Sequence, residues 1–445
     1  MLRVAVIGSG PSGCYTAQSL VQQDPTVRVD VLDRLPCPYG LVRYGVAPDH
    51  EKIKSLQTNL RRVLEHERVR FLGGVRVGAD GVSTARLREL YHAVVYCVGA
   101  ASDRHLGIPG EDLPGSWSAT QFVSWYSAHP DAVDDGFVRG VRSAVVIGVG
   151  NVAVDVARML ARGPEELSPT DMPQAALTAL AASEVTDIHM VGRRGPSQAR
   201  FTTKELRELG TLPGTDVVVD PAEAALDPAW SDPSELPAAQ RRNVDVLRAW
   251  SAGRTHDSPR RIRLRFFLRP VELLADDGRV GAVRFERTAP DGRGGVVGTG
   301  QFEVIEAQLV LRSVGYRGVP LDGLPFDPAT GTVPNTAGRV ERDCAVSPGE
   351  YVAGWIKRGP TGVIGTNRPC AKETVTSLLE DAPALLAKEV PEDPVAALRA
   401  QGVEPVSWEG WRSIERAEAE LGASLGRRVV KLADWGSLMA AARRT

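Results

Sequence analysis

The sequence predicts an α/β protein that contains two Rossmann-like dinucleotide-binding domains. A continuously apolar strand, a glycine-rich turn and a helix open the chain at residues 2–22, and the same order recurs at residues 143–161. Strands of this kind are typical of a parallel sheet whose two faces are both covered. A chain of 445 residues is also too long for one core of ordinary size. We therefore expect two domains, each with its own parallel sheet.

The first glycine turn has the spacing GxGxxG. The first glycine of such a turn allows a tight bend, the second lets the backbone approach a diphosphate, and the third lets the helix pack closely on the strand. The diphosphate then lies at the positive end of the helix. The three glycines here are Gly8, Gly10 and Gly13.

A carboxylate comes after this turn at the distance that the fold requires. Residues 28–33 form the next predicted strand, and Asp33 ends it about 20 residues after Gly13. From this place a carboxylate reaches a ribose 2′-hydroxyl, and its charge repels a 2′-phosphate. The first domain is therefore predicted to bind FAD or NAD, and not NADP.

The second turn, "GVGNVA", is succeeded by basic residues instead of an acid. Gly148 and Gly150 are present, and Ala153 is a permitted small residue in the third place. Residues 162–176 form a loop and an inserted helix, so the next strand comes late, at residues 185–192. Arg193 and Arg194 come directly after that strand, and guanidinium groups bind phosphate oxygens in bidentate fashion. A solvated charge pair is the simpler alternative, but the place at the strand end favours a clamp for the 2′-phosphate of NADP.

Two similar strands suggest where the chain leaves and re-enters the first domain. These are "HAVVYCVGA" at residues 92–100 and "AQLVLRSVGYRG" at residues 307–318. We therefore expect a discontinuous FAD-binding domain with an inserted NADP-binding domain. The FAD-binding domain takes residues 1–107 and 315–445, and the NADP-binding domain takes residues 108–314. Residues 289–301 are expected to be a surface loop or turn because they are rich in glycine. Residues 408–442 are expected to be amphipathic helices that serve packing.

Composition excludes several classes of protein. The net charge is −2, so no overall attraction to nucleic acid or to anionic membranes is expected. The five cysteines contain no CxxC pair, which argues against a disulfide framework, a zinc site or an iron–sulfur cluster, and we expect no metal. The apolar run at the N-terminus is too short for a signal peptide or a membrane span. A reducing compartment, the cytoplasm, is the simplest expectation.

Five segments together resemble a known family. They are "VIGSGPSGCYTAQ", "PYGLVRYGVAPDH", "GVGNVAVDVAR", "VGRRGPSQARFTTKELREL" and "GWIKRGPTGVIGTN". In order and spacing they are similar to ferredoxin–NADP reductases of the adrenodoxin-reductase type, flavoproteins with two dinucleotide-binding domains. The resemblance implies that NADPH gives a hydride to FAD and that single electrons then pass to an iron–sulfur ferredoxin or a flavodoxin-like acidic carrier. A cytochrome P450 is one acceptor that such a chain can feed. We expect a monomer.

The resemblance also assigns site residues. It implies that FAD is bound by Gly8, Gly10, Pro11, Ser12, Gly13, Asp33, Leu41, Val77, Trp355, Gly362, Val363 and Ile364. It implies that NADP is bound by Gly148, Gly150, Asn151, Val152, Arg193, Arg194, Glu205 and Gly362. A helix that starts near "PTGVIGTN" would stabilise negative charge on the reduced flavin through its dipole. Trp355 would give the flavin an aromatic neighbour, although a buried core tryptophan is the plain alternative.

Three polar residues are candidates for positioning and tuning the reaction: His50, Glu205 and Asp155. A histidine that is hydrogen-bonded within a loop is the plain alternative for His50, and hydride transfer itself needs no general base. Two positions depart from the family pattern. Asp33 stands where glutamate is usual, and Glu51 stands where proline is common. Either carboxylate can accept a hydrogen bond from ribose, and the absence of proline at position 51 only makes the backbone of the loop freer. Neither departure changes the assignment.

An acidic partner needs a locally basic docking surface. One candidate comprises Arg241, Arg242 and Arg248, of which the first and last share a helical face. The other is the strand-like run at residues 259–270, with five arginines. A solvated face is a plain alternative for both. The family's basic patch lies in the region of the first, which we therefore favour.

Three other interpretations compete with the reductase. A disulfide reductase shares the two-domain plan but needs a redox cysteine pair, which is absent. Another FAD-dependent oxidoreductase, such as an oxidase or hydroxylase, would not need a second nucleotide domain with arginines. An NADP-binding redox sensor or scaffold without turnover is separated from the reductase only by experiment.

Overall fold

The chain forms two compact units. The structure, a computed structural model, describes residues 1–133, 136–253 and 256–444. Unit 1 consists of Met1–Ser102, Ser127–Asp131 and Gly315–Thr445, and unit 2 consists of Asp103–Tyr126 and Ala132–Val314. The sequence boundary at residue 107 lies five residues beyond the end of the first segment. The hydroxyl of Thr120 donates to Asp103 Oδ1 at 2.8 Å, which ties this part of the chain to unit 2.

Unit 1 also includes the short segment Ser127–Asp131, which the sequence assigned to the inserted NADP-binding domain. In Ser127–Asp131, the Asp131 carboxylate accepts a hydrogen bond from Trp435 Nε1 at 2.7 Å. The same carboxylate forms a 2.7 Å ion pair with Arg34. Side-chain contacts with residues far away in the sequence hold this segment in unit 1. No local sequence pattern could therefore predict that it belongs there.

Unit 1 contains two stretches of secondary structure. The N-terminal stretch comprises β1 (Arg3–Ile7), α1 (Pro11–Gln23), β2 (Arg28–Leu32), α2 (Leu41–Tyr44), α3 (Glu51–Lys54), α4 (Leu56–Leu64), β3 (Val69–Leu72), α5 (Thr84–Leu90) and β4 (Ala93–Tyr96). The C-terminal stretch comprises β15 (Tyr316–Arg317), β16 (Asn335–Thr336), β17 (Arg339–Arg342), β18 (Ala345–Val352), α14 (Trp355–Arg358), the 3₁₀ turn η2 (Ile364–Thr366), α15 (Asn367–Leu385), α16 (Pro394–Arg399), α17 (Trp408–Ser424) and α18 (Trp435–Ala442).

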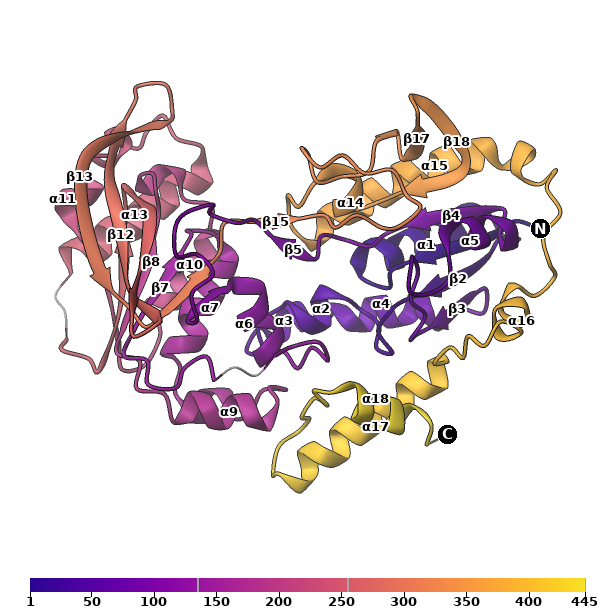
Figure 1. Ribbon diagram of the computed structural model, residues 1–445, viewed down its shortest axis with the longest axis horizontal. Coiled ribbons are helices and arrows are strands. Elements are labelled where there is room, and N and C mark those ends of the chain that lie inside the picture. The colour runs from indigo at the N-terminus through magenta and orange to yellow at the C-terminus, as the bar shows by residue number, and fades with distance from the viewer. Residues whose placement is uncertain (134–135, 254–255, 445) are drawn as a thin grey trace. The chain divides into compact units, whose positions relative to one another are not determined.

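The sheet of unit 1 has the strand order β16-β17-β18-β4-β1-β2-β3. The five strands from β18 to β3 are parallel, and β16 and β17 are antiparallel additions at one edge. Val4 and Val6 of β1 enter one apolar cluster, whereas Ala5 and Ile7 enter another. Both faces of the sheet are therefore covered, as the unbroken apolar strands predict. Helices α1 and α15 pack against each other (Figure 1).

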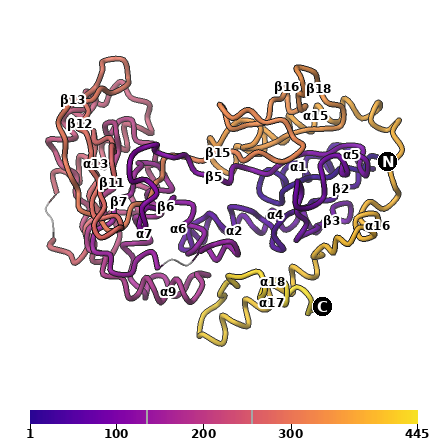
Figure 2. The backbone as a smooth tube through the Cα atoms, in the orientation of Figure 1, coloured from indigo at the N-terminus to yellow at the C-terminus, as the bar shows by residue number. Residues whose placement is uncertain are grey.

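Strands β4 and β18 join the two ends of the sequence. They pair in parallel, with Val95 opposite Tyr351. In the colours of Figure 2, an early violet segment therefore lies beside a late orange one within the same unit. The sheet of unit 1 is continuous only because the chain returns after unit 2.

Unit 2 comprises a larger set of elements. They are β6 (Ser116–Ser118), α6 (Ala119–Tyr126), β7 (Ser143–Ile147), α7 (Asn151–Ala161), α8 (Pro164–Leu167), α9 (Gln174–Ala181), β8 (Asp187–Val191), the 3₁₀ turn η1 (Pro196–Gln198), α10 (Thr203–Leu209), β9 (Thr215–Val219), α11 (Pro221–Ala224), α12 (Pro228–Ser231), α13 (Ala238–Ala252), β10 (Arg260–Arg265), β11 (Leu268–Asp276), β12 (Arg279–Pro290), β13 (Val296–Glu306) and β14 (Leu309–Arg312). The short strand β5 (Ser102–Asp103) stands where the chain passes from unit 1 to unit 2.

The main sheet of unit 2 is parallel, with the order β6-β14-β7-β8-β10-β9. Strands β14, β7 and β8 repeat the arrangement of β4, β1 and β2, which makes both units Rossmann-like. An antiparallel sheet, β11-β12-β13, shares an apolar cluster with β7 through residues such as Phe285 and Val145. The loop or turn expected at residues 289–301 is wrong in part, because β13 begins at Val296 and Gly298 is paired with Thr288 in the sheet.

Candidate functional site

The first glycine turn is shaped by contacts within the chain. Gly8 has φ +106°, and a Cβ there would lie 2.5 Å from the carbonyl oxygen of Cys97. A Cβ on Gly13 would lie 1.8 Å from the carbonyl oxygen of Gly8. Gly10 differs, since the nearest atom to its Cβ position is Gly40 Cα at 3.8 Å. Gly8 and Gly13 are therefore required for folding, whereas Gly10 leaves space at the start of α1 for a ligand.

Asp33 lies beside this turn, immediately after β2. Its Oδ2 accepts hydrogen bonds from the amide and the hydroxyl of Ser9, at 2.8 and 2.5 Å. Its Oδ1 accepts one from the Leu35 amide at 2.9 Å. Burial raises the pKa of Asp33, while the hydrogen bonds from Ser9 and Leu35 oppose that rise. A carboxylate oxygen can accept two hydrogen bonds, so Oδ1 retains the capacity to accept one from a ribose hydroxyl.

The segment before α2 approaches the turn closely. The Tyr39 amide donates to the carbonyl of Ser9 at 3.1 Å, and a Cβ on Gly40 would lie 2.9 Å from Gly10 Cα. Tyr39 itself has φ +82°, a conformation that is uncommon for residues other than glycine. Leu41, two residues after Tyr39, is 40% exposed, which is high for a leucine beside a glycine turn. An apolar side chain is thus available at the edge of the predicted FAD site.

The C-terminal part of unit 1 supplies another wall. Gly354 has φ +82°, and a Cβ there would lie 2.4 Å from Ser12 Oγ, so this segment lies against the start of α1. The next residue, Trp355, has a buried indole Nε1 that makes no hydrogen bond within the described part of the chain. A buried donor without a partner is costly and points to a ligand acceptor. Val363 is 62% exposed. These features fit an aromatic cofactor with polar edges.

The other residues predicted for unit 1 lie near helix starts or in a turn. The helix expected at "PTGVIGTN" begins as η2 at Ile364 and continues as α15. Gly362, with φ +80°, precedes it. Val77 is half-buried and bridges to Val82. His50 is buried at the start of α3, where its carbonyl accepts hydrogen bonds from the amides of the first turn.

The second glycine turn repeats the first in unit 2. Gly148 has φ +143°, and a Cβ there would lie 2.3 Å from the carbonyl oxygen of Ser313. A Cβ on Gly150 would meet no atom within 4 Å. Helix α7 begins at the next residue with no side-chain cap, so the amides of its first turn, including those of Asn151 and Val152, are available for a diphosphate. Ala153 is fully buried, in agreement with the need for a small residue there.

The two turns can be aligned through equivalent hydrogen bonds. The Gly8 amide donates to the carbonyl of Leu32 at 2.7 Å, and the Gly148 amide donates to that of Val191 at 2.9 Å. Asp33 therefore corresponds to Gly192. Arg193 comes one residue later than the acid of unit 1, which refines the expectation that the acid and the arginines share one position.

The arginines after β8 carry charge without carboxylate partners. Arg193 is exposed and Arg194 is half-buried, and neither forms an ion pair among the described residues. The Arg193 carbonyl accepts a hydrogen bond from the Thr288 hydroxyl at 2.8 Å, which fixes the backbone here. An exposed arginine that the sequence reasoning missed, Arg200, comes after η1 in the same segment.

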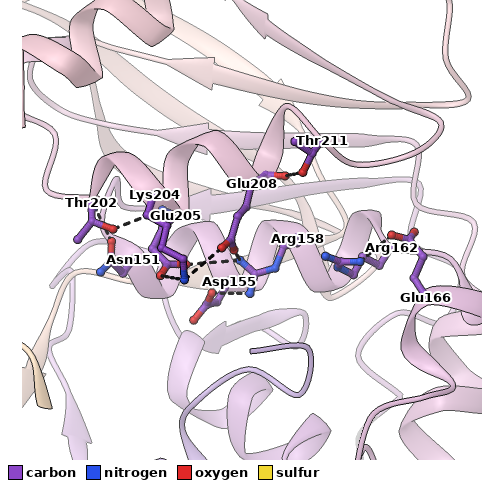
Figure 3. A network of polar contacts seen from close by, with 10 residues as sticks. All are labelled: Asn151, Asp155, Arg158, Arg162, Glu166, Thr202, Lys204, Glu205, Glu208 and Thr211. Carbon is purple, nitrogen blue, oxygen red and sulfur yellow. Dashed lines mark hydrogen bonds and ion pairs between the residues drawn. The ribbon is translucent and has the colours of Figure 1, made fainter. Parts of the chain in front are cut away.

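Asp155 and Glu205 share a buried guanidinium. Arg158 is completely buried, and its NH2 pairs with Asp155 Oδ1 at 2.7 Å. Its NH1 lies 3.8 Å from Glu205 Oε2 and 3.2 Å from Glu208 Oε2. Figure 3 shows Arg158 between these carboxylates. The predicted acids of unit 2 are thus brought together by a residue that the sequence reasoning did not single out, because an arginine on a helix is usually at the surface.

The predicted docking residues lie on α13. Arg241 and Arg242 are exposed, and Arg248 is half-buried over the ring of Trp230, with its guanidinium carbon 5.9 Å from the ring centroid. None of the three forms an ion pair within the described ranges. The rival run lies largely on β10, where Arg263 pairs with Asp187 at 3.0 Å and Arg265 with Glu223 at 2.5 Å. Arg263 and Arg265 are thus engaged in ion pairs within unit 2, which makes them less available for docking a partner.

The cysteines form no disulfide. All five are free, and only Cys344 is exposed. Burial raises the pKa of Cys37 to about 11 and that of Cys97 to about 12, which suppresses the reactive thiolate. Among the described residues, no helix combines the length and the apolar character needed to cross a membrane.

Comparisons with known proteins agree with this geometry. Residues 2–210 match the family described as pyridine nucleotide-disulphide oxidoreductase. The chain is 45% identical over 454 residues to NADPH-ferredoxin reductase FprA of Mycobacterium tuberculosis, covering 98% of each protein. It is 40% identical over 461 residues to the mitochondrial NADPH:adrenodoxin oxidoreductase of Arabidopsis thaliana, covering 99% of this chain and 95% of that protein. A solved structure of M. tuberculosis FprA in complex with NADPH matches with a TM-score of 0.93 and 44% identity, covering 99% of both chains.

Proposed function

The chain belongs to the family of NADPH-ferredoxin and NADPH:adrenodoxin reductases, and we propose from this membership and from its two nucleotide sites that it passes electrons from NADPH through FAD to a ferredoxin. It is an FAD-dependent oxidoreductase that uses NADP(H). When bound, FAD accepts a hydride from NADPH and releases electrons singly. The observation that carries the proposal is the opposite charge after two equivalent strands, Asp33 in unit 1 and Arg193 with Arg194 in unit 2.

Unit 1 is proposed to hold FAD. The FAD diphosphate would lie at Gly10, Pro11, Ser12 and Gly13, where Gly10 leaves space at the start of α1, and Asp33 would accept a hydrogen bond from the ribose. Leu41, Val77, Trp355, Gly362, Val363 and Ile364 would surround the isoalloxazine. The positive end of the helix that begins at Ile364 would favour negative charge on the ring.

Unit 2 is proposed to hold NADPH. Gly148, Gly150, Asn151 and Val152 would bind its diphosphate through backbone amides, and Arg193 and Arg194 would bind the 2′-phosphate. Glu205 would lie towards the nicotinamide portion. Because Arg158 neutralises Asp155 and Glu205, we assign these two acids, like His50, to orientation of the ligands and not to proton transfer.

The electron acceptor is of the ferredoxin type, and we propose that it is acidic. Arg241, Arg242 and Arg248 on α13 are proposed to dock it, since they are basic and form no ion pairs in the described part of the chain. We further propose that the protein works as a monomer in the cytoplasm. Five free cysteines fit a reducing compartment.

The central test is spectroscopic. NADPH should bleach the flavin band of the purified protein near about 450 nm, from ordinary flavin chemistry. The protein should then reduce cytochrome c only when a ferredoxin is present. A flavin that NADPH leaves oxidised would end the reductase proposal in favour of a sensor or scaffold, and cytochrome c reduction that does not depend on ferredoxin would remove the ferredoxin as partner.

Docking is tested separately. Arg241→Glu with Arg242→Glu should raise the KM for ferredoxin and weaken its dependence on salt, without changing flavin reduction by NADPH. Arg279→Glu with Arg293→Glu, two exposed arginines elsewhere in unit 2, is a control with the same change in net charge. Equal effects of the double variant and the control would show that net charge, and not α13, controls the encounter.

A further inference from the structure

Arg200 is held beside the second glycine turn. Its backbone amide donates a hydrogen bond of 2.8 Å to the carbonyl of Val149, the residue between Gly148 and Gly150. Two residues later, the Thr202 amide donates to Asn151 Oδ1 at 2.8 Å. These two bonds tie the segment after η1 to the turn and to the first residue of α7. The position of Arg200 is therefore fixed relative to the predicted nucleotide site, although its side chain is exposed.

The charge of Arg200 acts on the predicted clamp. The pKa of Arg194 is lowered from its ordinary value, first by burial, next by Arg200 and then by Arg193. Geometry also places Arg200 near this segment. Val149, whose carbonyl accepts the hydrogen bond from Arg200, lies against Gly192, since a Cβ on Gly192 would be 3.1 Å from Val149 Cγ2. Arg200 is therefore held close to the stretch that contains Arg193 and Arg194.

No carboxylate of the described residues neutralises these three arginines. None of Arg193, Arg194 and Arg200 forms an ion pair there, and the hydrogen bonds of the three residues involve backbone atoms only, such as the Arg194 carbonyl, which accepts from the Phe267 amide. Two less exposed arginines of unit 2 differ in this respect: Arg158 faces three acids and Arg265 faces two. Three uncompensated guanidinium groups in one place repel one another, so the arrangement favours an anion of high charge.

The anion that best matches this charge is the 2′-phosphate of NADPH. A phosphate monoester carries a charge of roughly −1.5 to −2 near neutral pH and offers three acceptor oxygens. The diphosphate of the same ligand has a different partner, because the free amides at the start of α7 are available to it. Arg200 is thus the third cation of the site that recognises the ribose phosphate.

We propose that Arg200 is a third guanidinium ligand of the 2′-phosphate of NADPH, acting with Arg193 and Arg194 to select NADPH over NADH. The proposal rests on the proposed NADPH site of unit 2 and adds a specificity-determining residue to it. The sequence signal for it is a single arginine in "PSQARFT", outside the paired arginines that end the strand.

Binding of nucleotide fragments to the full-length, FAD-loaded protein tests the proposal. The probes are 2′,5′-ADP, which carries the 2′-phosphate, and 5′-AMP, which lacks it. Arg200→Ala should weaken binding of 2′,5′-ADP by about tenfold or more, the usual loss for a charged hydrogen bond, and leave 5′-AMP nearly unchanged. Arg200→Lys keeps the positive charge but not the planar guanidinium that binds two oxygens at once, so it should lose less affinity for 2′,5′-ADP than Arg200→Ala does. Arg279→Ala is the control for removal of an exposed arginine from unit 2 and should change neither.

Each other outcome has a defined meaning. If Arg200→Ala binds 2′,5′-ADP as the parent protein does, Arg200 is a solvated surface residue and the inference fails. If it loses affinity equally for both probes, the residue acts elsewhere on the nucleotide and the inference also fails. If the parent protein itself does not prefer 2′,5′-ADP to 5′-AMP, the proposed NADPH site fails, which is a separate result. FAD content and thermal unfolding of each variant establish that it is folded.

Discussion

Arg43 and Glu418 form a buried ion pair of 2.5 Å across 375 residues of sequence. The side chains are 5% and 3% exposed. Lys431 Nζ donates to the carbonyl of Arg43 at 2.7 Å, and the Leu432 amide donates to Glu418 Oε1 at 3.0 Å. The C-terminal helix α17 is thereby attached to α2, next to the glycine turn of unit 1. The sequence predicted only a packing role for residues 408–442. Their contacts with Arg43 show that they also support the predicted FAD site.

Loss of the Glu418 charge should destabilise unit 1 strongly. Glu418→Gln leaves the Arg43 guanidinium buried without a counter-charge, which costs about 3 to 5 kcal/mol of unfolding free energy. Urea unfolding monitored by flavin release measures the loss. Glu415→Gln removes the partner of Arg61 from a half-exposed pair and should cost about 1 kcal/mol or less. Similar small costs for both variants would contradict the role of the buried pair.

Gly150→Ala should separate folding from nucleotide binding. The backbone at Gly150 has φ −120°, which alanine adopts without strain, and its Cβ would meet no protein atom within 4 Å. Stability should therefore change little. The methyl group would occupy the approach of the diphosphate, so we expect affinities for both NADP⁺ and NAD⁺ to fall by about tenfold or more, as for loss of charged hydrogen bonds. Gly148→Ala, with a Cβ 2.3 Å from Ser313 O, should instead impair folding. Unchanged nucleotide affinity in Gly150→Ala would place the diphosphate elsewhere.

Arg193→Ala should affect one nucleotide only. Losing a charged hydrogen bond to the 2′-phosphate costs about 1.5 to 3 kcal/mol, so the KM for NADPH should rise by more than about tenfold. The KM for NADH, which lacks that phosphate, should stay nearly constant. Steady-state rates with both nucleotides provide the measurement, and an equal loss for both would refute the clamp.

Protonation of His189 should lower the unfolding free energy of unit 2 as the pH falls. Burial and then the charges of Arg265 and Arg263 lower the pKa of His189 from 6.5 to about 4. The unfolded imidazole binds a proton near pH 6.5 and the folded one only near pH 4, so stability is complete above this window and falls as the pH falls through it. For a half-buried group we expect on the order of 2 kcal/mol.

The control for this prediction replaces His189 with a residue whose side chain does not titrate. His189→Gln should unfold with a weaker dependence on pH between about 6.5 and about 4 than the parent protein does. Circular dichroism during urea unfolding, at several pH values, gives both slopes. Parallel pH profiles for the two proteins would assign the acid sensitivity to other groups.

The sequence predicted the two Rossmann-like folds because their signals are local. Glycine spacing, an apolar strand and the acid or arginine after the next strand all lie within short segments, and Gly8, Gly148 and Asp33 lie at the turns where they were expected. The register could not be predicted from spacing, since only the hydrogen bond from Gly148 to Val191 shows that Arg193 stands one place beyond the position of Asp33.

Other features depend on contacts that no local pattern contains. The backbone of Arg200 is held beside the second glycine turn by its hydrogen bond to the carbonyl of Val149. The side chain of Arg158 is held by acids on two helices, α7 and α10. The segment Ser127–Asp131 joins unit 1 through Trp435, which lies some three hundred residues later in the chain. Strand β13 was missed because glycine weakens the strand signal even where antiparallel pairing sustains the strand.

The pairing of β4 with β18 sets an order of assembly during translation. All of unit 2 is synthesised between these two strands, so the ribosome completes unit 2 while the sheet of unit 1 still lacks its neighbour to β4. Until β18 emerges, the nascent chain exposes an unpaired strand edge, which is a site for aggregation or for chaperone binding. The unit whose synthesis begins first is therefore completed last.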